Sequence, residues 1–216
     1  MNPIILDVGA AGGKMTQQWY DKLKKGKFYC FEPLPSNFEI LSTKFKDKNN
    51  VYLYNVAIND TEGMQTFYIC PYANSSSLLP FVKENAKRWK HPKGTEKIDF
   101  SKTEEINVQS VRLDTFLRNN NLNDSTIDFI KIDTQGNDLK VVKSLGDKIY
   151  NVREIMLEVQ IVPFEHYKGQ SKKTDILDYM SSKGFKEYKK NKQSFGQEEN
   201  IWFINTKFSY YLHLGF

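Results

Sequence analysis

Acidic side chains stand at or next to the ends of the short apolar runs in this sequence. Asp7, Glu32, Asp133 and Glu158 occupy four such places. In an open sheet of parallel strands, the carboxyl ends of the strands meet at one edge, where ligands bind. A single acid there often only caps a helix or faces solvent in a turn, but the repetition indicates a site. Carboxylates can accept hydrogen bonds from hydroxyls, balance a cation or take a proton from a nucleophile.

A loop of small residues, Gly9 to Gly13, follows the first apolar run. After such a turn, Glu32 at the end of the second strand can accept both hydroxyls of a ribose, in enzymes that use NAD and in enzymes that use S-adenosylmethionine (SAM). The Gly-x-Gly-x-x-Gly fingerprint of NAD enzymes is absent, because Ala11 occupies its second glycine position. Asp7 would also repel a pyrophosphate. SAM carries an ammonium and a sulfonium instead, so the sequence favours SAM.

The elements that must position these acids alternate between strand and helix. Apolar runs predict strands at 4–8, 28–31 and 51–58, with a helix at 14–25 and another opened by a capping box, Ser36 to Glu39. This alternation is typical of a doubly wound α/β fold. Further along the chain we expect the following elements: a helix carrying Leu113, Phe116 and Leu117, a strand at 127–132, a helix at 137–145, a strand at 154–159, a helix at 174–183, and an antiparallel pair at 185–189 and 200–205.

The regular alternation stops between residues 59 and 107. A strand at 66–70 is expected there, and the segment 83–102 is rich in lysine. We expect an insertion at the edge or mouth of the sheet, which either covers the acceptor as a lid or forms a solvated charged loop. Trp89 and Ser75 to Ser77 could contact a glycan. The C-terminal tail, 206–216, could pack on the core or form an oligomer contact.

Composition excludes several classes of protein. The 216 residues have 39% hydrophobic and 14% aromatic side chains, which excludes a wholly disordered chain and fits one domain, 1–216. No apolar run could span a membrane, and the N-terminus does not read as a signal peptide. Two cysteines, Cys30 and Cys70, favour a reducing, cytoplasmic location. The net charge of +5 permits an anionic partner without requiring one.

An ordered set of motifs resembles the FkbM family of class I SAM-dependent methyltransferases, over roughly residues 4–205. The motifs that carry the resemblance are Asp7-Val8-Gly9-Ala10-Ala11-Gly12-Gly13, Phe31-Glu32-Pro33, Asn55-Val56-Ala57-Ile58, Arg112-Leu113-Asp114-Thr115-Phe116, Lys131-Ile132-Asp133-Thr134-Gln135-Gly136 and Leu157-Glu158-Val159. The set departs from the family at Ala11, where an Asn is frequent, and at Gln135, where a Glu is frequent.

The resemblance implies a Rossmann-like sheet of seven strands in the order 3-2-1-4-5-7-6, with strand 7 antiparallel. It implies that Asp133 faces the methyl group, that Asp7 lies near the methionine end of SAM, and that Glu32 holds the ribose. The full set of residues expected to bind the cofactor is Asp7, Gly9, Ala10, Ala11, Gly13, Glu32, Pro33, Val56, Ala57 and Asp133.

The resemblance further implies methylation of a hydroxyl, most often on a sugar. Such a hydroxyl needs a base, and the candidates are Asp133, Glu158 and His166. A divalent metal is the less favoured alternative: Asp133, Asp138 and Glu158 could converge, but Asp138 lies where a helix dipole alone favours an acid. No Cys/His spacing indicates zinc.

Three other interpretations stay open: methylation of another small molecule, methylation of nucleic acid, and a SAM-binding module without catalysis. A nucleic-acid substrate is disfavoured because the turn from Asp133 to Gly136 lacks the Pro-Pro-aromatic motif of amino-methylating DNA enzymes. The first strand begins at about residue 4, so cover for the acceptor must come from 59–107 or from a partner. We expect either a compact enzyme or a domain of a longer protein, such as one fused to or associated with a glycosyltransferase.

Overall fold

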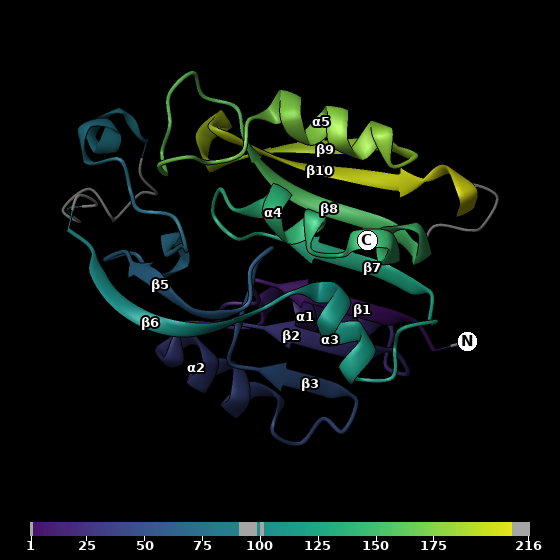
Figure 1. Cartoon of the computed structure of the whole chain (residues 1–216). Helices are drawn as coiled ribbons and strands as arrows, with labels where there is room; N and C mark the ends of the chain where they lie inside the picture. Colours follow the sequence, from purple (N-terminus) through teal and green to yellow (C-terminus); the bar gives the residue numbers. More distant parts are fainter. Residues whose placement is uncertain (1, 91–98, 100–101, 209–216) are drawn as a thin grey trace.

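Seven strands form the main sheet of the computed structural model, which describes residues 2–90, 99 and 102–208 (Figure 1). Their order is β3-β2-β1-β7-β8-β10-β9. Strand β10 is antiparallel to both of its neighbours, and the other neighbouring pairs are parallel. This confirms the predicted seven-stranded order and its antiparallel strand. The bounds are β1 Ile4–Val8, β2 Lys27–Phe31, β3 Val51–Tyr54, β7 Ile127–Ile132, β8 Val152–Gln160, β9 Phe185–Gln193 and β10 Glu198–Asn205.

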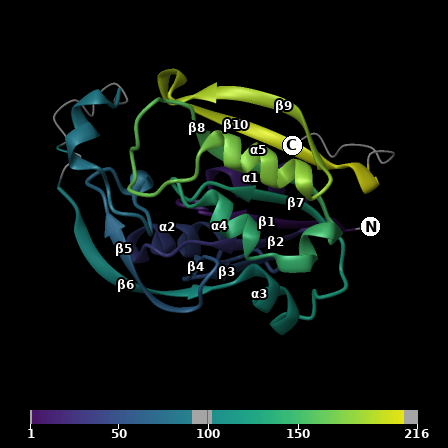
Figure 2. The same cartoon turned by 45° about the horizontal axis from the view of Figure 1, so that its top comes forward.

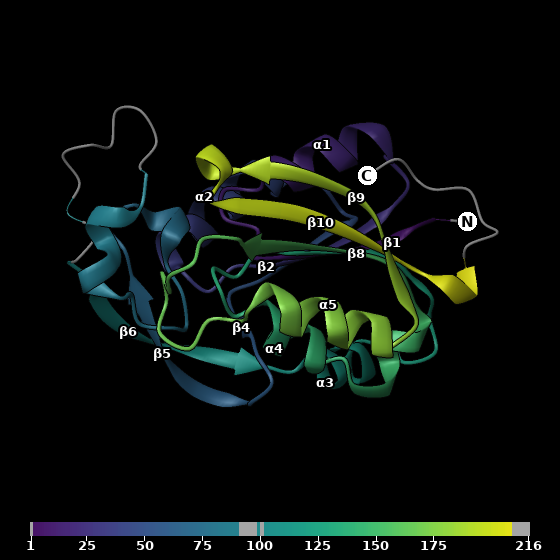
Figure 3. The same cartoon turned by 90° about the horizontal axis from the view of Figure 1, so that it is seen from above.

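Helices cover both faces of this sheet. Seen from above, α1 lies on one face, and α3, α4 and α5 lie on the other (Figure 3). Trp19 of α1 and Leu41 of α2 pack into one apolar core, whereas the other three helices pack into a second, larger core. The central strands are buried on both sides, as continuous apolar runs require. The helix bounds are α1 Lys14–Lys22, α2 Pro35–Phe45, α3 Leu113–Asn119, α4 Asp138–Lys143 and α5 Lys173–Ser182.

The prediction of one continuous strand over 51–58 was wrong. Strand β3 ends at Tyr54, and the short strand β4, Ala57–Ile58, belongs to a second sheet of order β4-β6-β5. Asn55 causes the break, because its side-chain amide donates to the backbone oxygens of Glu32 and Pro33, at 2.8 and 3.1 Å. Those bonds turn the chain away from the main sheet at the point where a ligand would need space.

The second sheet accounts for much of the predicted insertion. Strand β5, Gly63–Ile69, runs antiparallel to β6, Glu104–Val111. Both strands lie at the end of the molecule opposite to the N-terminus (Figure 2), where the parallel strands of the main sheet end. The insertion therefore lies at the mouth of the sheet. Residues 91–98, 100 and 101 of the lysine-rich segment and 209–216 of the tail are outside the described residues.

The prediction that a capping box at Ser36 opens the second helix was also wrong. Helix α2 begins at Pro35, and no side chain caps its N-terminus. Proline suits the first helical position, because its fixed φ is already helical and its missing N–H would have had no partner there. Separately, none of the helices in the described part of the chain combines the length and apolar character needed to cross a bilayer.

Candidate active site

The loop after β1 is shaped by its close approach to β7. Gly9 has a φ of +75°, and a Cβ there would lie 2.0 Å from the backbone oxygen of Asp133. Only glycine fits such a contact. The amides of Gly9 and Ala10 both donate to the oxygen of Phe31, at 3.0 Å. These bonds fix the loop over the ends of β1 and β2.

Glu32 leaves β2 with its carboxylate against this loop. The amide of Ala11 donates to Oε2 at 2.8 Å, and the amide of Leu34 donates to Oε1 at 2.9 Å. Burial raises the pKa of Glu32, whereas these amides and the charge of Lys131 act in the opposite direction. Each oxygen keeps a free lone pair. The carboxylate can therefore accept two further hydrogen bonds from a vicinal diol.

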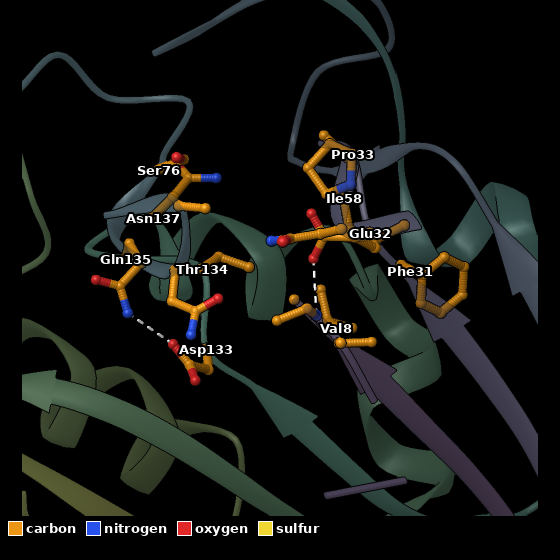
Figure 4. A pocket seen from close by; sticks show the side chains of 18 of the residues that line it. Val8, Phe31, Glu32, Pro33, Ile58, Ser76, Asp133, Thr134, Gln135 and Asn137 are labelled. Atoms are coloured by element: carbon orange, nitrogen blue, oxygen red, sulfur yellow. Dashed lines mark hydrogen bonds between the residues drawn. The ribbon is translucent and has the colours of Figure 1, made fainter. Parts of the chain in front are cut away.

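A cavity of about 410 Å³ opens between Glu32 and Asp133, and Val8 also lines it (Figure 4). Its volume lies in the range of small-molecule sites, about 300–1,000 Å³. The bonds of Asn55 direct the chain away from the main sheet beside this cavity. Apolar side chains of both sheets line it, including Phe31 of the main sheet and Phe67 of the second sheet. The predicted cofactor residues that line the cavity are Gly9, Ala10, Ala11, Glu32, Pro33, Val56, Ala57 and Asp133.

Two predicted cofactor residues do not line this cavity. Gly13 is the residue before α1, and a Cβ there would lie 2.5 and 2.6 Å from side-chain atoms of Phe45 and Leu41, so its role is packing. Asp7 is only 1% exposed. Its Oδ2 accepts a hydrogen bond from Thr16 at 2.5 Å, and its Oδ1 lies 3.2 Å from the ammonium of Lys131. Asp7 therefore does not face the cavity but holds Lys131, which does line it.

Lys131 lines the larger cavity, although it was not among the residues predicted for the site. Its ammonium donates to the backbone oxygen of Gly9 at 2.5 Å and lies 3.5 Å from Oδ2 of Asp133. Burial alone would lower the pKa of Lys131, but the carboxylates of Asp7 and Asp133 raise it, so the side chain stays charged. One buried cation thus links the loop to both acids. The available signal was a lysine inside the apolar run from Ile127 to Ile132.

A second, smaller cavity of about 190 Å³ adjoins the first. Both are lined by Asn74, Asp133 and Gln135, so they meet at these residues. All three predicted catalytic residues line the second cavity. Its complete lining is Tyr72, Asn74, Ser75, Trp89, Lys90, Asp133, Gln135, Glu158, His166, Ser194, Phe195 and Glu198.

Gln135 connects two of the candidate bases. Its Nε2 donates to Oδ1 of Asp133 and to Oε2 of Glu158, both at 2.8 Å, while its Oε1 accepts from the hydroxyl of Tyr167 at 2.8 Å. A glutamate could not donate in this way. The residue that departs from the family pattern is therefore the hydrogen-bonded link between the two acids.

The pKa values of the two acids are shifted in opposite directions. Burial alone would raise the pKa of Asp133, but the ammonium of Lys131 lowers it below its usual range. Burial, and then the negative charge of Asp133, raise the pKa of Glu158 well above that of an ordinary glutamate. The ionised form is thus favoured at Asp133, and the protonated form is favoured at Glu158. This is the pairing of environments that separates a base from an acid.

His166 is packed among aromatic rings. Its imidazole stacks on Trp89 at 3.9 Å and meets the edge of Phe81 at 4.2 Å. The residue is buried, although it contributes to the lining of the second cavity. The imidazole of His166 packs Trp89 against the core. This packing is sufficient to explain a buried histidine at this position.

Asp138 is engaged by the loop before α4 rather than free for a metal. Its carboxylate accepts the amides of Thr134 and Gly136, both at 3.1 Å. Burial, followed by the charge of Asp133, raises the pKa of Asp138 to about 7. Within residues 2–90, 99 and 102–208, no three His, Cys, Asp or Glu side chains are arranged to hold a metal ion.

Glu198 and Phe195 also escaped the sequence analysis. Both lie where β9 turns into β10, and both line the second cavity. Burial raises the pKa of Glu198 to about 7, against the hydrogen bond from Ser194. The sequence shows Glu198 only as an acid at the start of the last strand. Its place in the cavity follows from the pairing of β10 with β8, which joins segments that are distant in the sequence.

Comparisons with known proteins find similar sequences among methyltransferases. The family described as "Methyltransferase FkbM domain" matches residues 7–187. The 2-O-methyltransferase NoeI of Sinorhizobium fredii (strain NBRC 101917 / NGR234) is 26% identical over 181 residues, covering 84% of this chain and 72% of that protein. Methyltransferase sdnD of Sordaria araneosa is 25% identical over 182 residues, covering 73% of this chain and 66% of that protein.

Solved structures share the fold at low sequence identity. A fibrillarin/Nop5p complex matches with a TM-score of 0.52 and 14% identity, covering 94% of this chain and 73% of that one. Aeropyrum pernix fibrillarin, described with natively bound S-adenosyl-L-methionine, matches with a TM-score of 0.50 and 13% identity, covering 94% of this chain and 66% of that one. These similarities show the fold alone.

Proposed function

This chain belongs to the FkbM methyltransferase family, and from that membership we propose that it transfers the methyl group of SAM to a hydroxyl group of a sugar. The SAM-dependent methyltransferase class follows from the family. The observation that carries the proposal is the meeting of two cavities at Asp133 and Gln135. One cavity is built for a nucleoside, and the other brings carboxyl groups to the same point.

The larger cavity fits SAM by the chemistry of its walls. The carboxylate of Glu32 would accept the two ribose hydroxyls, and Val56, Ala57 and Ile58 would cover the adenine. The backbone of the loop from Gly9 would pass along the methionine end, where an acid such as Asp133 favours a cation. When bound there, SAM supplies an electrophilic methyl group.

Asp133 is the residue placed to take the proton of the acceptor. It is ionised, it lines both cavities, and Gln135 and Lys131 fix its two oxygens. In the overall transfer, the acceptor oxygen would lose its proton to Asp133 and bond to the methyl carbon as the bond from that carbon to sulfur breaks, which would release S-adenosylhomocysteine. Glu158, which lines the second cavity beside Asp133, can form a hydrogen bond with a neighbouring hydroxyl of the acceptor. Alignment of the reactants supplies a large part of the rate in such displacements.

Three features support a sugar as the acceptor. The second cavity is small and contains Glu158 and Glu198, which can bond to several hydroxyls of one ring. Aromatic side chains, Tyr72, Trp89 and Phe195, complete its lining, and the apolar face of a sugar suits such rings. The relative NoeI is named as a 2-O-methyltransferase.

A methyl-transfer assay tests the proposal. The chain would be incubated with SAM and a panel of free sugars, glycosides and glycans, and the products analysed by mass spectrometry and by NMR. We expect S-adenosylhomocysteine to form together with an O-methylated sugar. Calorimetric titration with SAM and with NAD is the cofactor control. Failure to bind SAM, or methylation confined to nucleic acid or to amines, would refute the assignment.

We extend the proposal to domain arrangement and location. Residues 1–216 act as one methyltransferase domain, in which the second sheet and the segment up to Lys90 cover the acceptor. The two cysteines are buried and unpaired, which is compatible with a reducing compartment such as the cytoplasm. Fractionation of cells that express a tagged chain would check the location.

A further inference from the structure

An exposed phenylalanine stands at the mouth of the second cavity on an unfavourable backbone. Phe195 is 61% exposed, although most large apolar side chains of this chain are buried. It and its neighbour Ser194 have φ angles of +57° and +46°. Non-glycine residues rarely adopt this left-handed conformation, and two in succession persist only where the surroundings impose them. Burial of Phe195 cannot be the reason, because the ring is not buried.

The surroundings that impose this backbone are specific. Gln197 is buried, and its Nε2 donates to the backbone oxygens of Ser194 and Lys90 at 2.8 and 2.9 Å. Its Oε1 accepts the amide of Lys90 at 2.6 Å. One side chain thus joins the β9–β10 turn to the segment that carries Trp89. A further hydrogen bond joins Ser194 to Glu198.

These bonds bring together two walls of one cavity. Trp89 and Lys90 come from the insertion, whereas Phe195 and Glu198 come from the last hairpin, and all four line the same cavity as Asp133. Gln197 therefore holds an aromatic ring at the rim of the place where the acceptor must enter. A loop that only connected β9 to β10 would need neither the exposed ring nor the link to Lys90.

We propose that Phe195 is the acceptor-binding platform, on which the apolar face of a sugar ring stacks while its hydroxyls bond to Glu158 and Glu198. This inference rests on the proposed function and adds the binding mode of the acceptor. A sugar ring has one face rich in C–H groups and an edge of hydroxyls. A phenyl ring beside carboxyl groups matches both parts of that chemistry.

Binding and turnover of Phe195→Ala and Phe195→Trp test the platform. Methyl glucoside and methyl galactoside serve as probes, and saturation-transfer NMR reports which ring protons contact the protein. For Phe195→Ala we expect the KM of the better sugar to rise about five- to tenfold, with kcat and the SAM dissociation constant within about twofold of the parent values. Phe195→Trp should restore the KM, because it restores the aromatic face.

Met64→Ala is the matched control. Met64 is 62% exposed, lies on β5, and lines neither cavity, so its removal should leave the KM unchanged. An unchanged KM in Phe195→Ala would overturn the platform, and so would an equal loss of SAM affinity. Sugar binding by the parent chain that is lost in Phe195→Ala, without any methyl transfer, would support the platform and refute the proposed function instead.

Discussion

The two adjoining cavities are built from different kinds of structure. The larger cavity, called the cofactor cavity because we propose that it binds SAM, lies on the ends of β1, β2 and β7, and backbone amides bond to both carboxylate oxygens of Glu32 there. The second cavity, called the acceptor cavity because we propose that it binds the acceptor, is formed by the insertion, the end of β8 and the last hairpin. The pKa values of Glu158 and Glu198 in this cavity are raised, and the turn that carries Phe195 is strained. In the function that we propose, a regular framework thus holds the cofactor, while irregular segments select the acceptor, as is common in enzymes.

Asp133 belongs to both cavities, and its replacement should give the largest effect. In Asp133→Asn we expect kcat to fall about 100- to 10,000-fold, since the base is lost. The SAM dissociation constant should change less than about tenfold, because Glu32 and the loop remain. Steady-state kinetics and calorimetry separate the two quantities. If kcat in Asp133→Asn equals that of the parent, Asp133 is not the base, and the base is then Glu158 or His166. The same assay on Glu158→Gln and His166→Gln would distinguish these two.

Glu32→Gln should affect the cofactor cavity alone. The amide keeps one acceptor oxygen and places an NH2 group against the amide of either Ala11 or Leu34. We expect SAM to bind on the order of 10- to 100-fold more weakly, since hydrogen bonds to a charged group contribute about 1.5–3 kcal/mol. Calorimetric titration measures this. Glu39→Gln, on the exposed side of α2, is the control, and equal affinities for both variants would contradict the ribose assignment.

The pH dependence of the free energy of unfolding should report the raised pKa of Glu198 in the acceptor cavity. The ordinary pKa of Glu198 is 4.5 and burial raises it to about 7 in the folded chain. Between those values the folded chain keeps a proton that the unfolded chain has released, so raising the pH destabilises the fold. The loss begins near pH 4.5, is complete above about pH 7, and amounts to at most about 3 kcal/mol.

Urea unfolding at about pH 5 and about pH 8 measures this loss. Asp138 contributes in the same direction, because its pKa is also raised to about 7. In Glu198→Gln the difference between the two pH values should shrink, whereas in Glu104→Gln, an exposed control on β6, it should not. A pH dependence that is the same in Glu198→Gln and in the parent would contradict the buried, protonated state of Glu198.

The smallest effect should come from relieving the strained turn. Glycine adopts positive φ without strain, which favours Phe195→Gly by about 1–3 kcal/mol, but it also gives the unfolded chain more freedom, by about 0.4–1 kcal/mol. We expect a net gain of about 0.5–1 kcal/mol in the free energy of unfolding, together with weaker acceptor binding. Asn121→Gly, at a φ of +57° outside both cavities, should gain less because asparagine tolerates this conformation. A loss of stability in Phe195→Gly would show that the ring serves the fold.

The cofactor cavity was largely predictable from the sequence, for a local reason. Glu32 directly follows the buried strand β2, and Gly9 directly follows the buried strand β1, so neighbouring residues define both positions. Errors arose where a distant contact overrides the local pattern. The apolar run over 51–58 reads as one strand, but Asn55 bends it through bonds to Glu32 and Pro33.

The acceptor cavity was only partly predictable, because its geometry depends on distant pairings. Glu158 was a candidate because of its motif and His166 because of the ordinary pKa of histidine, yet Phe195 was not a candidate, since nothing in its neighbours predicts a positive φ. Gln135 was noticed as a departure from the family, but its role as a donor to two acids requires β7 and β8 to lie side by side. Lys131 carries a charge whose partner, Asp7, is remote in sequence.

The pair formed by Asp7 and Lys131 has a consequence for how the two central strands find their alignment. The two residues are direct neighbours in the register of β1 and β7. A slip by one position would turn one of these side chains to the opposite face of the sheet, and a slip by two would leave a buried ammonium opposite an apolar side chain. Misaligned pairings are thus penalised by electrostatics, which hydrophobic residues such as Ile5 and Phe129 cannot do. We expect a chain with Asp7→Leu and Lys131→Met to stay compact but to lose unique strand alignment, which amide hydrogen exchange along β1 would reveal as heterogeneous protection.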